Sequence, residues 1–209
     1  MEKFKTIKIN AVAEIEEKRS RFIGSAFYVE NEEEAEKIIK DTKKKYYDAR
    51  HNCFAYIINN GSVAKRFSDD GEPSGTAGSP ILNVLEKNEL YNVLVIVTRY
   101  FGGILLGAGG LVRAYTEAAV KAIEKAEIVE QENGFELEIW ISYQDMEKMK
   151  YYCDKNNIKI IKWEYGENIG CTIEVTNAEK DIILTDYKYN DKMPNIIDYK
   201  VIREKFIRK

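Results

Sequence analysis

The sequence predicts an α+β protein made of two consecutive domains. Short segments with alternating apolar residues are separated by segments with the apolar spacing of helices, and this pattern begins again after Ala126. A length of 209 residues suits one large domain or two small ones, and a hydrophobic content of 44% is normal for a soluble globular protein. We place the domains at residues 1–130 and 135–209, because the stretch between them, EQENG, is polar and turn-like.

The first domain is expected to contain strands and three helices, of which the second is short and the third is long. Asn31 is a good capping residue for a helix whose acids come first and whose lysines come last, and NNG at 59–61 indicates a hairpin. The apolar strand before the long helix is expected at the centre of the sheet. In order, the expected segments are strands 3–15 and 19–29, helix 31–46, strands 52–58 and 62–68, helix 76–88, strand 92–100 and helix 107–127.

The second domain repeats strands and helices in the order β-α-β-β-α-β. This order is the ferredoxin-like arrangement. Asn177 is the expected cap of its second helix. The expected segments are strand 135–143, helix 144–157, strands 158–166 and 170–176, helix 177–190 and strand 198–207.

Composition excludes several classes of function. A formal net charge of −3, with neither half basic, argues against a strongly electrostatic nucleic-acid binder and predicts a shallow salt dependence for any contact with RNA. The three cysteines are far apart and form no CxxC pair, so a zinc site is not expected, and neither is a cofactor. The N-terminus lacks an apolar signal core and no apolar run could span a bilayer, so we expect a cytoplasmic protein without membrane contact.

A glycine-rich run at 99–113, RYFGGILLGAGGLVR, follows the apolar strand and opens the long helix. Backbone N–H groups at a helix entrance are unpaired, and glycines let a ligand approach them, so phosphate or carboxylate binding is the physical expectation. The run is neither a Walker loop nor a dinucleotide fingerprint, and tight packing of strand against helix explains its glycines equally well. The glycines are Gly102, Gly103, Gly107, Gly109 and Gly110.

A second unusual run, FSDDGEPSGTAGSP at 67–80, combines acids with glycines and hydroxyl residues. Asp69, Asp70 and Glu72 could bind a hard cation or handle a proton. They could equally lie on a solvated turn, with Ser74 or Thr76 capping the next helix.

His51 is the only histidine, and Cys53 lies two residues further along the same strand. Side chains two apart on a strand point the same way, but nothing nearby resembles a nucleophile signature. Cys53 is expected in the core, and His51 is expected to be a polar edge group or a ligand contact. Arginine suits phosphate or carboxylate recognition, and a surface ion pair is the alternative for each arginine near these runs. These arginines are Arg21, Arg50, Arg66, Arg99 and Arg113.

At HNCFAY, DDGEPSGTAGSPIL and RYFGGILLGAGGLVRAYTEA the sequence resembles the IMPACT family, in its bacterial YigZ-like branch. The resemblance covers nearly the whole first domain, and ILLG stands where some members have a lysine. The positions that carry it are Arg21, His51, Asn52, Asp70, Gly71, Glu72, Pro73, Ser74, Gly75, Thr76, Arg99, Tyr100, Phe101, Gly102, Gly103, Gly107, Gly109, Gly110 and Arg113.

The resemblance implies a fold and a setting. The first domain should be like the second domain of a small-subunit ribosomal protein, and the ferredoxin-like second domain should resemble domain V of elongation factor G. Two translation-factor-like domains in tandem imply a partner in translation: RNA, the ribosome or a translation factor. Eukaryotic members of the family regulate translation under amino-acid stress by competing for a kinase activator, but they carry a different extra domain.

Our hypothesis is that the two glycine-containing runs line one polar concavity that binds such a partner or a small anionic ligand. A hydrolase or phosphate-handling enzyme that uses Asp70 and Glu72 is the competing interpretation. The expected ligand-binding residues are Arg21, His51, Asp70, Glu72, Ser74, Thr76, Arg99, Tyr100, Gly102, Gly103, Gly107, Gly109, Gly110 and Arg113.

Overall fold

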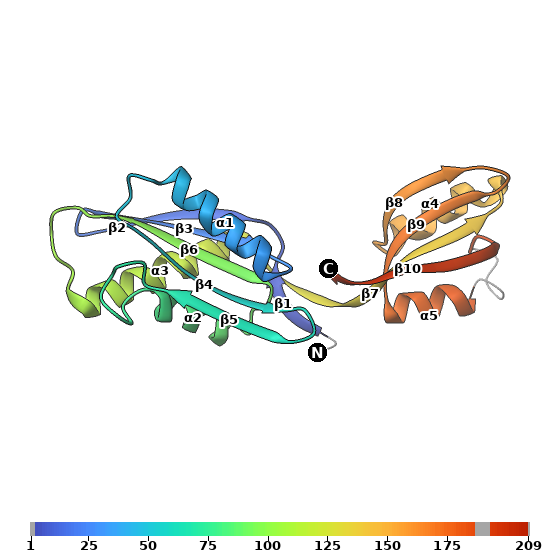
Figure 1. Ribbon diagram of the computed structural model, residues 1–209. Helices are drawn as coiled ribbons and strands as arrows, with labels where there is room; N and C mark the ends of the chain where they lie inside the picture. The colour runs from blue at the N-terminus through green and yellow to red at the C-terminus, as the bar shows by residue number, and fades with distance from the viewer. Residues whose placement is uncertain (1–2, 187–192, 209) are drawn as a thin grey trace. The chain divides into compact units, whose positions relative to one another are not determined.

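The computed structural model describes residues 3–186 and 193–208 (Figure 1). The chain divides into two compact units, an N-terminal unit of Phe4–Glu130 and a C-terminal unit of Gln131–Lys209 together with Met1–Lys3. Both units combine a β-sheet with helices, which confirms the α+β class. The division into domains at residues 1–130 and 135–209 stays a prediction.

The N-terminal unit is built on a five-stranded antiparallel sheet in the order β2-β3-β6-β4-β5. The apolar strand β6 is at its centre, as expected, because both of its faces are covered. β4 and β5 form the expected hairpin. The strands are β2 (Ala11–Glu17), β3 (Ser20–Tyr28), β4 (His51–Asn59), β5 (Val63–Ser68) and β6 (Val93–Tyr100).

Helices cover both faces of this sheet. α1 lies on one face, and α2 and α3 lie on the other (Figure 1). Residues of α2 and α3 pack with the sheet in one large apolar cluster, and residues of α1 pack with the opposite face in a smaller one. The helices are α1 (Glu32–Lys45), α2 (Gly78–Lys87) and α3 (Gly107–Ala126).

The first turn of α1 forms as the sequence predicts. Asn31 Oδ1 accepts a hydrogen bond from the backbone N–H of Glu34 at 2.9 Å, which satisfies one of the unpaired donors of the helix start. Ala35 and Ile39, four residues apart, bury one face of the helix.

The C-terminal unit has the predicted β-α-β-β-α-β order. β7 pairs with both β9 and β10, and β9 pairs with β8, all antiparallel. Its apolar core lies between this sheet and the helices. The elements are β7 (Ile128–Ile141), a 3-10 turn (Tyr143–Asp145), α4 (Met146–Lys155), β8 (Lys159–Tyr165), β9 (Ile169–Thr176), α5 (Asn177–Asp186) and β10 (Ile196–Arg208).

The expected first strand, 3–15, is two strands. β1 (Lys3–Ile7) pairs with β7, and β2 belongs to the N-terminal sheet. Between them the N–H groups of Lys8 and Ile9 donate to the carbonyl of Ala126 at the end of α3. Alternation of apolar residues continues through this break, so the sequence pattern does not reveal it.

Two further expectations are wrong at the level of single residues. The stretch EQENG, residues 130–134, is not a turn, because it lies within β7. Its residues 131–134 pair with β10, and Gly134 also pairs with β9. Thr176 rather than Asn177 caps α5: Thr176 Oγ1 accepts from the N–H of Glu179 at 3.2 Å, and Glu179 Oε2 accepts from the N–H of Thr176 at 2.9 Å. Residues 187–190 of that expected helix lie outside the described residues.

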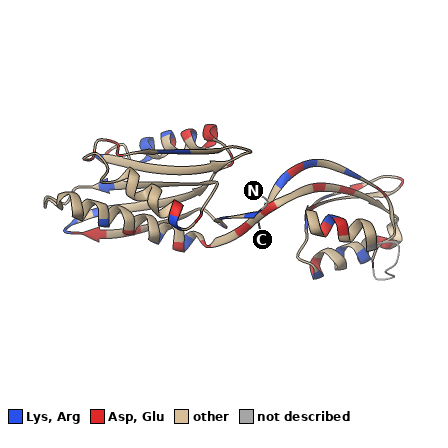
Figure 2. Cartoon of the chain, turned by 90° about the horizontal axis from the view of Figure 1, so that it is seen from below, with Lys and Arg blue, Asp and Glu red and all other residues tan. Residues whose placement is uncertain are grey.

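Acidic and basic residues are mixed over both units (Figure 2). Within the part of the chain that the structure describes, we find no helix of sufficient length and hydrophobicity to cross a membrane.

Candidate functional site

Loops at one end of the N-terminal sheet carry most of the predicted site residues. β4 begins at His51, which pairs with Arg99 near the end of β6, and β5 ends at Ser68, opposite the first half of β4. Loops 69–77 and 101–106 therefore leave the sheet at the same end. We call these two loops and the adjoining strand ends the loop end.

Asp69 closes the first loop. Its Oδ2 accepts from the N–H of Gly75 at 2.9 Å, and its Oδ1 accepts from the N–H groups of Ala77 and Gly78 at 3.0 and 2.8 Å. The carboxylate thus satisfies the first donors of α2 and complements the positive end of its dipole. Neither Ser74 nor Thr76 caps this helix.

Asp70 ties the loop to two other elements. Its Oδ2 accepts from the N–H of Asn52 in β4 at 2.7 Å, and its Oδ1 contacts Lys43 Nζ of α1 at 2.5 Å. Asp70 and Gly71 have φ values of 43° and 85°, which aspartate tolerates and glycine adopts freely. Both oxygens of Asp70 are therefore occupied by internal partners.

Glu72 lies at the centre of a buried polar group. Its Oε1 accepts from Arg99 Nη1 at 2.7 Å and from the Tyr115 hydroxyl of α3 at 2.8 Å. The side chains of Glu72 and Arg99 are only 3% and 7% exposed, so this is a charge-assisted hydrogen bond in a low-dielectric setting. Burial is the main cause that raises the pKa of Tyr115, which keeps its hydroxyl a donor at neutral pH.

The guanidinium of Arg99 is enclosed on several sides. Its carbon lies 5.5 Å from the ring centroids of both Phe22 and Phe101. Among the residues that the structure describes, none accepts a hydrogen bond from its buried Nε. Arg99 therefore acts as a fixed positive centre inside the loop end.

His51 faces the same group. Its Nδ1 lies 2.9 Å from the carbonyl oxygen of Asp70, and because that oxygen only accepts, Nδ1 is the donor. Its Nε2 lies 3.9 Å from Glu72 Oε1. The imidazole is thus oriented by the first loop and points toward the buried carboxylate.

Cys53 is not positioned as a nucleophile. Its Sγ donates to the carbonyl of Asp69 at 3.0 Å, and the residue is fully buried. Burial raises the pKa of the Cys53 thiol to about 12, so the reactive thiolate is not formed at neutral pH. The expectation that Cys53 lies in the core is confirmed.

The glycines of the second run have different roles. A Cβ on Gly102 would lie 2.0 Å from the backbone of Arg19, and the N–H of Gly102 donates to Ser20 Oγ at 3.2 Å, so this position is packing. Gly103 and Gly107 have φ values of 85° and 69°, and a Cβ on either would meet open space. These two glycines therefore shape the loop backbone.

The remaining two glycines lie in the first turn of α3. Gly110 is buried against Leu106, whereas Gly109 is exposed and its nearest side-chain neighbour is Arg113 Nη1, 3.8 Å from an added Cβ. Leu106 offers no side-chain cap to the helix. The positive end of α3 is thus accessible beside an exposed arginine.

Other predicted residues lie on the rim of the loop end. The Arg21 guanidinium stacks on Tyr100 at 5.0 Å, and the Tyr100 hydroxyl donates to Asp48 at 2.8 Å. Thr76 is buried and its hydroxyl donates to the carbonyl of Pro73, while Ser74 is exposed.

Apolar side chains project from the second loop, which the sequence analysis did not single out. Phe101, Ile104 and Leu105 are 44%, 42% and 82% exposed. Leu105 is the most exposed of them and stands between the two glycines with left-handed backbone, Gly103 and Gly107. Clustered exposed apolar residues mark interaction sites more often than isolated ones do.

The two runs do meet, but not as an open acidic hollow. Their contact is the buried group of Glu72, Arg99 and Tyr115. Both oxygens of Asp70 and Oε1 of Glu72 already contact internal partners. A cavity of about 370 Å³ between α2 and α3 is lined in part by Gly75, Ser79 and Pro80 of the first run and by Val112 of the second. The exposed arginines, the loop glycines and Ser74 remain candidates for contact with a partner.

Lys43 was not singled out as a site residue, because its contact with Asp70 joins elements that are distant in the sequence. Asp69 and Asn52 were named from the sequence, but their roles as the acceptor at the start of α2 and as the donor to Asp70 depend on hydrogen bonds that the linear sequence does not show. Tyr115 could have been found, because it lies four residues after buried Leu111 on the inner face of a predicted helix. Within 3–186 and 193–208, no three or more His, Cys, Asp or Glu side chains are grouped so that they could hold a metal ion.

Comparison with known proteins identifies the family. The profile of the Impact N-terminal domain matches residues 18–123, a span that includes the whole loop end. The IMPACT family member YvyE of Bacillus subtilis is 34% identical over 207 residues, which cover 92% of this chain and 95% of that protein. The chain belongs to the IMPACT family.

Two further comparisons extend over most of the chain. An IMPACT family member of Haemophilus influenzae is 37% identical over 180 residues, which cover 84% of this chain and 85% of that protein. A crystal structure described only as that of a hypothetical protein has 27% sequence identity and a TM-score of 0.62, and it covers 97% of this chain. The matches to YvyE and to this crystal structure therefore extend into the C-terminal unit, which the domain profile does not reach.

Proposed function

We propose that this IMPACT family member is a translation-associated binding protein that contacts RNA, the ribosome or a translation factor through its loop end. The observation that carries the proposal is the exposed apolar tip of Phe101, Ile104 and Leu105, of which Ile104 and Leu105 lie between Gly103 and Gly107, two glycines with positive φ. A rigid scaffold that presents an exposed loop is a common arrangement for recognition.

The base of the tip is fixed by buried contacts. Arg99 lies two residues before the loop in the chain. Its guanidinium contacts Glu72 and two aromatic rings. Gly102 is held against the β2–β3 turn. A loop anchored in this way loses little conformational entropy when it binds, which favours affinity.

The translational setting follows from family membership. The sequence resembles the bacterial branch of the family, and the eukaryotic members of the same family regulate translation. A cytoplasmic location is part of the same proposal. Arg21 and Arg113 on the rim are placed to meet an anionic or polar partner surface.

The contacts of the acids support binding over hydrolysis. A general acid or base needs a free position toward substrate, and both oxygens of Asp70 and Oε1 of Glu72 accept bonds from the protein itself. The thiol of Cys53 is held protonated by burial, which removes it as a nucleophile.

The test is co-sedimentation of the purified full chain with purified ribosomes. Leu105→Ser removes the most exposed apolar side chain and is expected to reduce the sedimented fraction about tenfold, because a central apolar anchor contributes roughly 1–2 kcal/mol or more. Val63→Ser is the matched control, since Val63 is 49% exposed at the opposite end of the same sheet.

Equal sedimentation of Leu105→Ser and the unaltered chain would show that the tip is not the contact. If neither protein sediments with ribosomes, the Leu105→Ser variant and the unaltered chain are compared for binding to a purified translation factor and to ribosomal RNA. Failure of the unaltered chain to bind ribosomes, the translation factor or ribosomal RNA overturns the proposal.

A further inference from the structure

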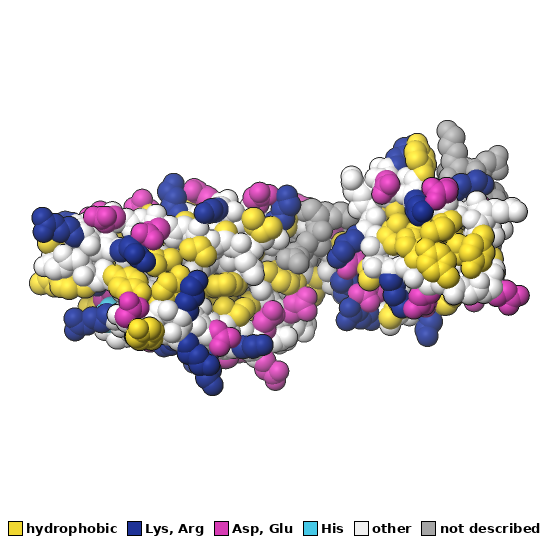
Figure 3. Space-filling view, turned by 90° about the horizontal axis from the view of Figure 1, so that it is seen from above, with side chains coloured by type: hydrophobic (Ala, Val, Ile, Leu, Met, Phe, Trp, Pro, Cys, Tyr) yellow, Lys and Arg dark blue, Asp and Glu magenta, His cyan; other side chains and the backbone are white. Residues whose placement is uncertain are grey.

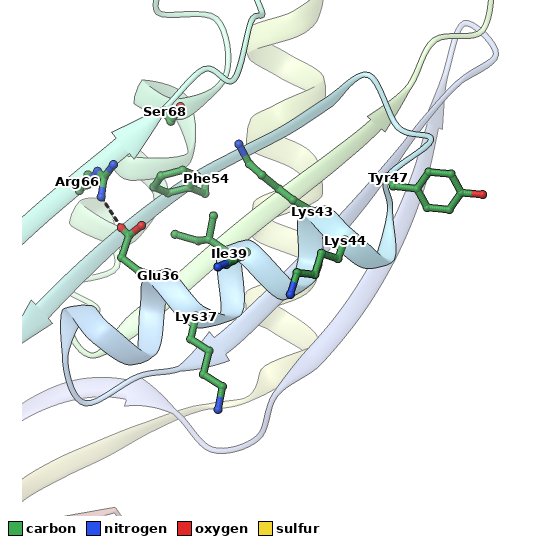
Figure 4. A pocket seen from close by; sticks show the side chains of 10 residues that line it. Glu36, Lys37, Ile39, Lys43, Lys44, Tyr47, Phe54, Arg66 and Ser68 are labelled. Carbon is green, nitrogen blue, oxygen red and sulfur yellow. Dashed lines mark hydrogen bonds and ion pairs between the residues drawn. The ribbon is translucent and has the colours of Figure 1, made fainter.

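A long groove runs between α1 and the strand β5, on the sheet face opposite α2 and α3 (Figure 4). Its volume is about 920 Å³. Figure 3 shows the N-terminal unit from above, with Lys and Arg side chains interspersed with Asp and Glu. The groove is lined by Glu36, Lys37, Ile39, Lys40, Lys43, Lys44, Tyr47, Phe54, Arg66 and Ser68.

Positive charge predominates in the groove. Five of its ten lining residues are lysine or arginine and one is acidic. Two ion pairs cross it, Glu36 with Arg66 and Lys43 with Asp70, and they join α1 to the hairpin and to the first loop. Both pairs neutralise cations at the groove wall without filling the space between.

Lys40 lies between these two pairs on the helix. It is four residues after Glu36 and three before Lys43, so the three share one face of α1. Lys37 and Lys40 have no ion-pair partner among the described residues, and Lys44 has only Asp41 at 3.7 Å. Like charges at this spacing repel one another, and an anion in the groove would relieve that repulsion.

An aromatic side chain stands at one end of the groove. Tyr47 is 85% exposed and projects from the end of α1 (Figure 4). The apolar floor, by contrast, is closed: Phe54 and Ile39 are only 4% and 6% exposed. The exposed groups at the groove are therefore the lysines and the ring of Tyr47.

We propose that this groove binds a single-stranded RNA segment, with Lys37, Lys40 and Lys44 on its phosphates and Tyr47 stacked on a base. A positively charged groove flanked by an exposed aromatic ring is the arrangement that binds single strands with little sequence preference. An acidic peptide would match the charge of the groove, and the competition with polyglutamate below tests that alternative. The proposal concerns a different surface from the loop end and holds whether or not the loop end binds a partner.

The experiment measures fluorescence anisotropy of a labelled single-stranded oligouridylate titrated with the full chain at several salt concentrations. Each lost phosphate contact reduces the number of released counterions by about 0.7, which lowers the affinity about fivefold at about 0.1 M salt. The double variant Lys37→Gln with Lys40→Gln is therefore expected to weaken binding about 25-fold at that salt concentration. The slope of log affinity against log salt should become less negative by about 1.4. Tyr47→Ser should weaken binding about fivefold or more with little change in that slope.

Matched controls separate a local site from general charge. Lys148→Gln combined with Lys155→Gln removes two lysines from α4, and Tyr151→Ser removes a tyrosine that is 62% exposed there. Both controls should bind the RNA within about twofold of the unaltered chain. Equal losses in controls and groove variants, or displacement of the RNA by polyglutamate at equal charge concentration, would overturn the proposal.

Discussion

Arg99 Nη1 and Glu72 Oε1 lie 2.7 Å apart, and both side chains are almost fully removed from solvent. The pair joins the central strand to the first loop, and Tyr115 brings α3 to the same oxygen. Three elements of the N-terminal unit are thus held at one carboxylate.

Glu72→Leu should therefore destabilise the protein strongly. It leaves the Arg99 charge buried without its partner, which costs about 3–5 kcal/mol of unfolding free energy. Urea unfolding measures the change. The double variant Glu72→Leu with Arg99→Leu should lose less than the sum of the two single variants, and strict additivity would refute the coupling.

An exposed pair supplies the comparison. Lys65 and Glu86 contact each other at 2.8 Å, but their side chains are 46% and 39% exposed. Glu86→Gln should change stability by less than about 1 kcal/mol, because solvent screens such pairs.

Asp69→Ala should also be costly, although Asp69 looks like an ordinary loop acid in the sequence. Three backbone N–H groups lose their acceptor, and we expect a loss of about 2–3 kcal/mol of unfolding free energy. Hydrogen exchange should show faster exchange of the Ala77 and Gly78 amides. Ser74→Ala serves as the control and should leave both stability and exchange unaltered.

Two glycines of the second run should respond in opposite ways to alanine. A Cβ at Gly102 would overlap the Arg19 backbone, so Gly102→Ala should lower the melting temperature by several degrees. Gly109→Ala meets nothing closer than 3.8 Å within a helix, so it should be neutral or stabilise by up to about 1 kcal/mol. A large destabilisation at Gly109 would contradict the helical assignment of this position.

The buried thiol of Cys53 predicts a loss of stability at alkaline pH. Folding raises its pKa from 9.0 to about 12, so the unfolded chain loses this proton first, and stability falls as pH rises through that window. Between pH 8 and pH 10 this thiol should cost about 1.4 kcal/mol of unfolding free energy. Cys53→Ala isolates the contribution, since its stability should fall by that much less over the same interval; an identical fall in both proteins would argue against it.

The sequence pattern predicted the elements whose apolar residues or capping residues are close together in the chain. β6 was placed at the centre because eight consecutive residues with few polar members fit a strand covered on both faces, and α1 was found from its cap and its charge order. The order of the C-terminal elements followed from periodicity alone.

What the pattern did not predict depends on contacts between distant residues. The break between β1 and β2 forms because Lys8 and Ile9 meet the end of α3, more than a hundred residues later. The role of Asp69 depends on where Ala77 and Gly78 turn back toward it, and the engagement of Asp70 and Glu72 depends on α1, β4 and α3. Local composition suggested free acids, whereas the folded chain uses them as internal acceptors.

The bracing of the first loop by Asp69 has a practical consequence for protein engineering. The Asp69 carboxylate accepts hydrogen bonds from both Gly75 and the start of α2. A change at exposed Ser74 should therefore leave the position of α2 unaltered. Short peptide tags or epitopes could be spliced in at that apex while the scaffold keeps its shape.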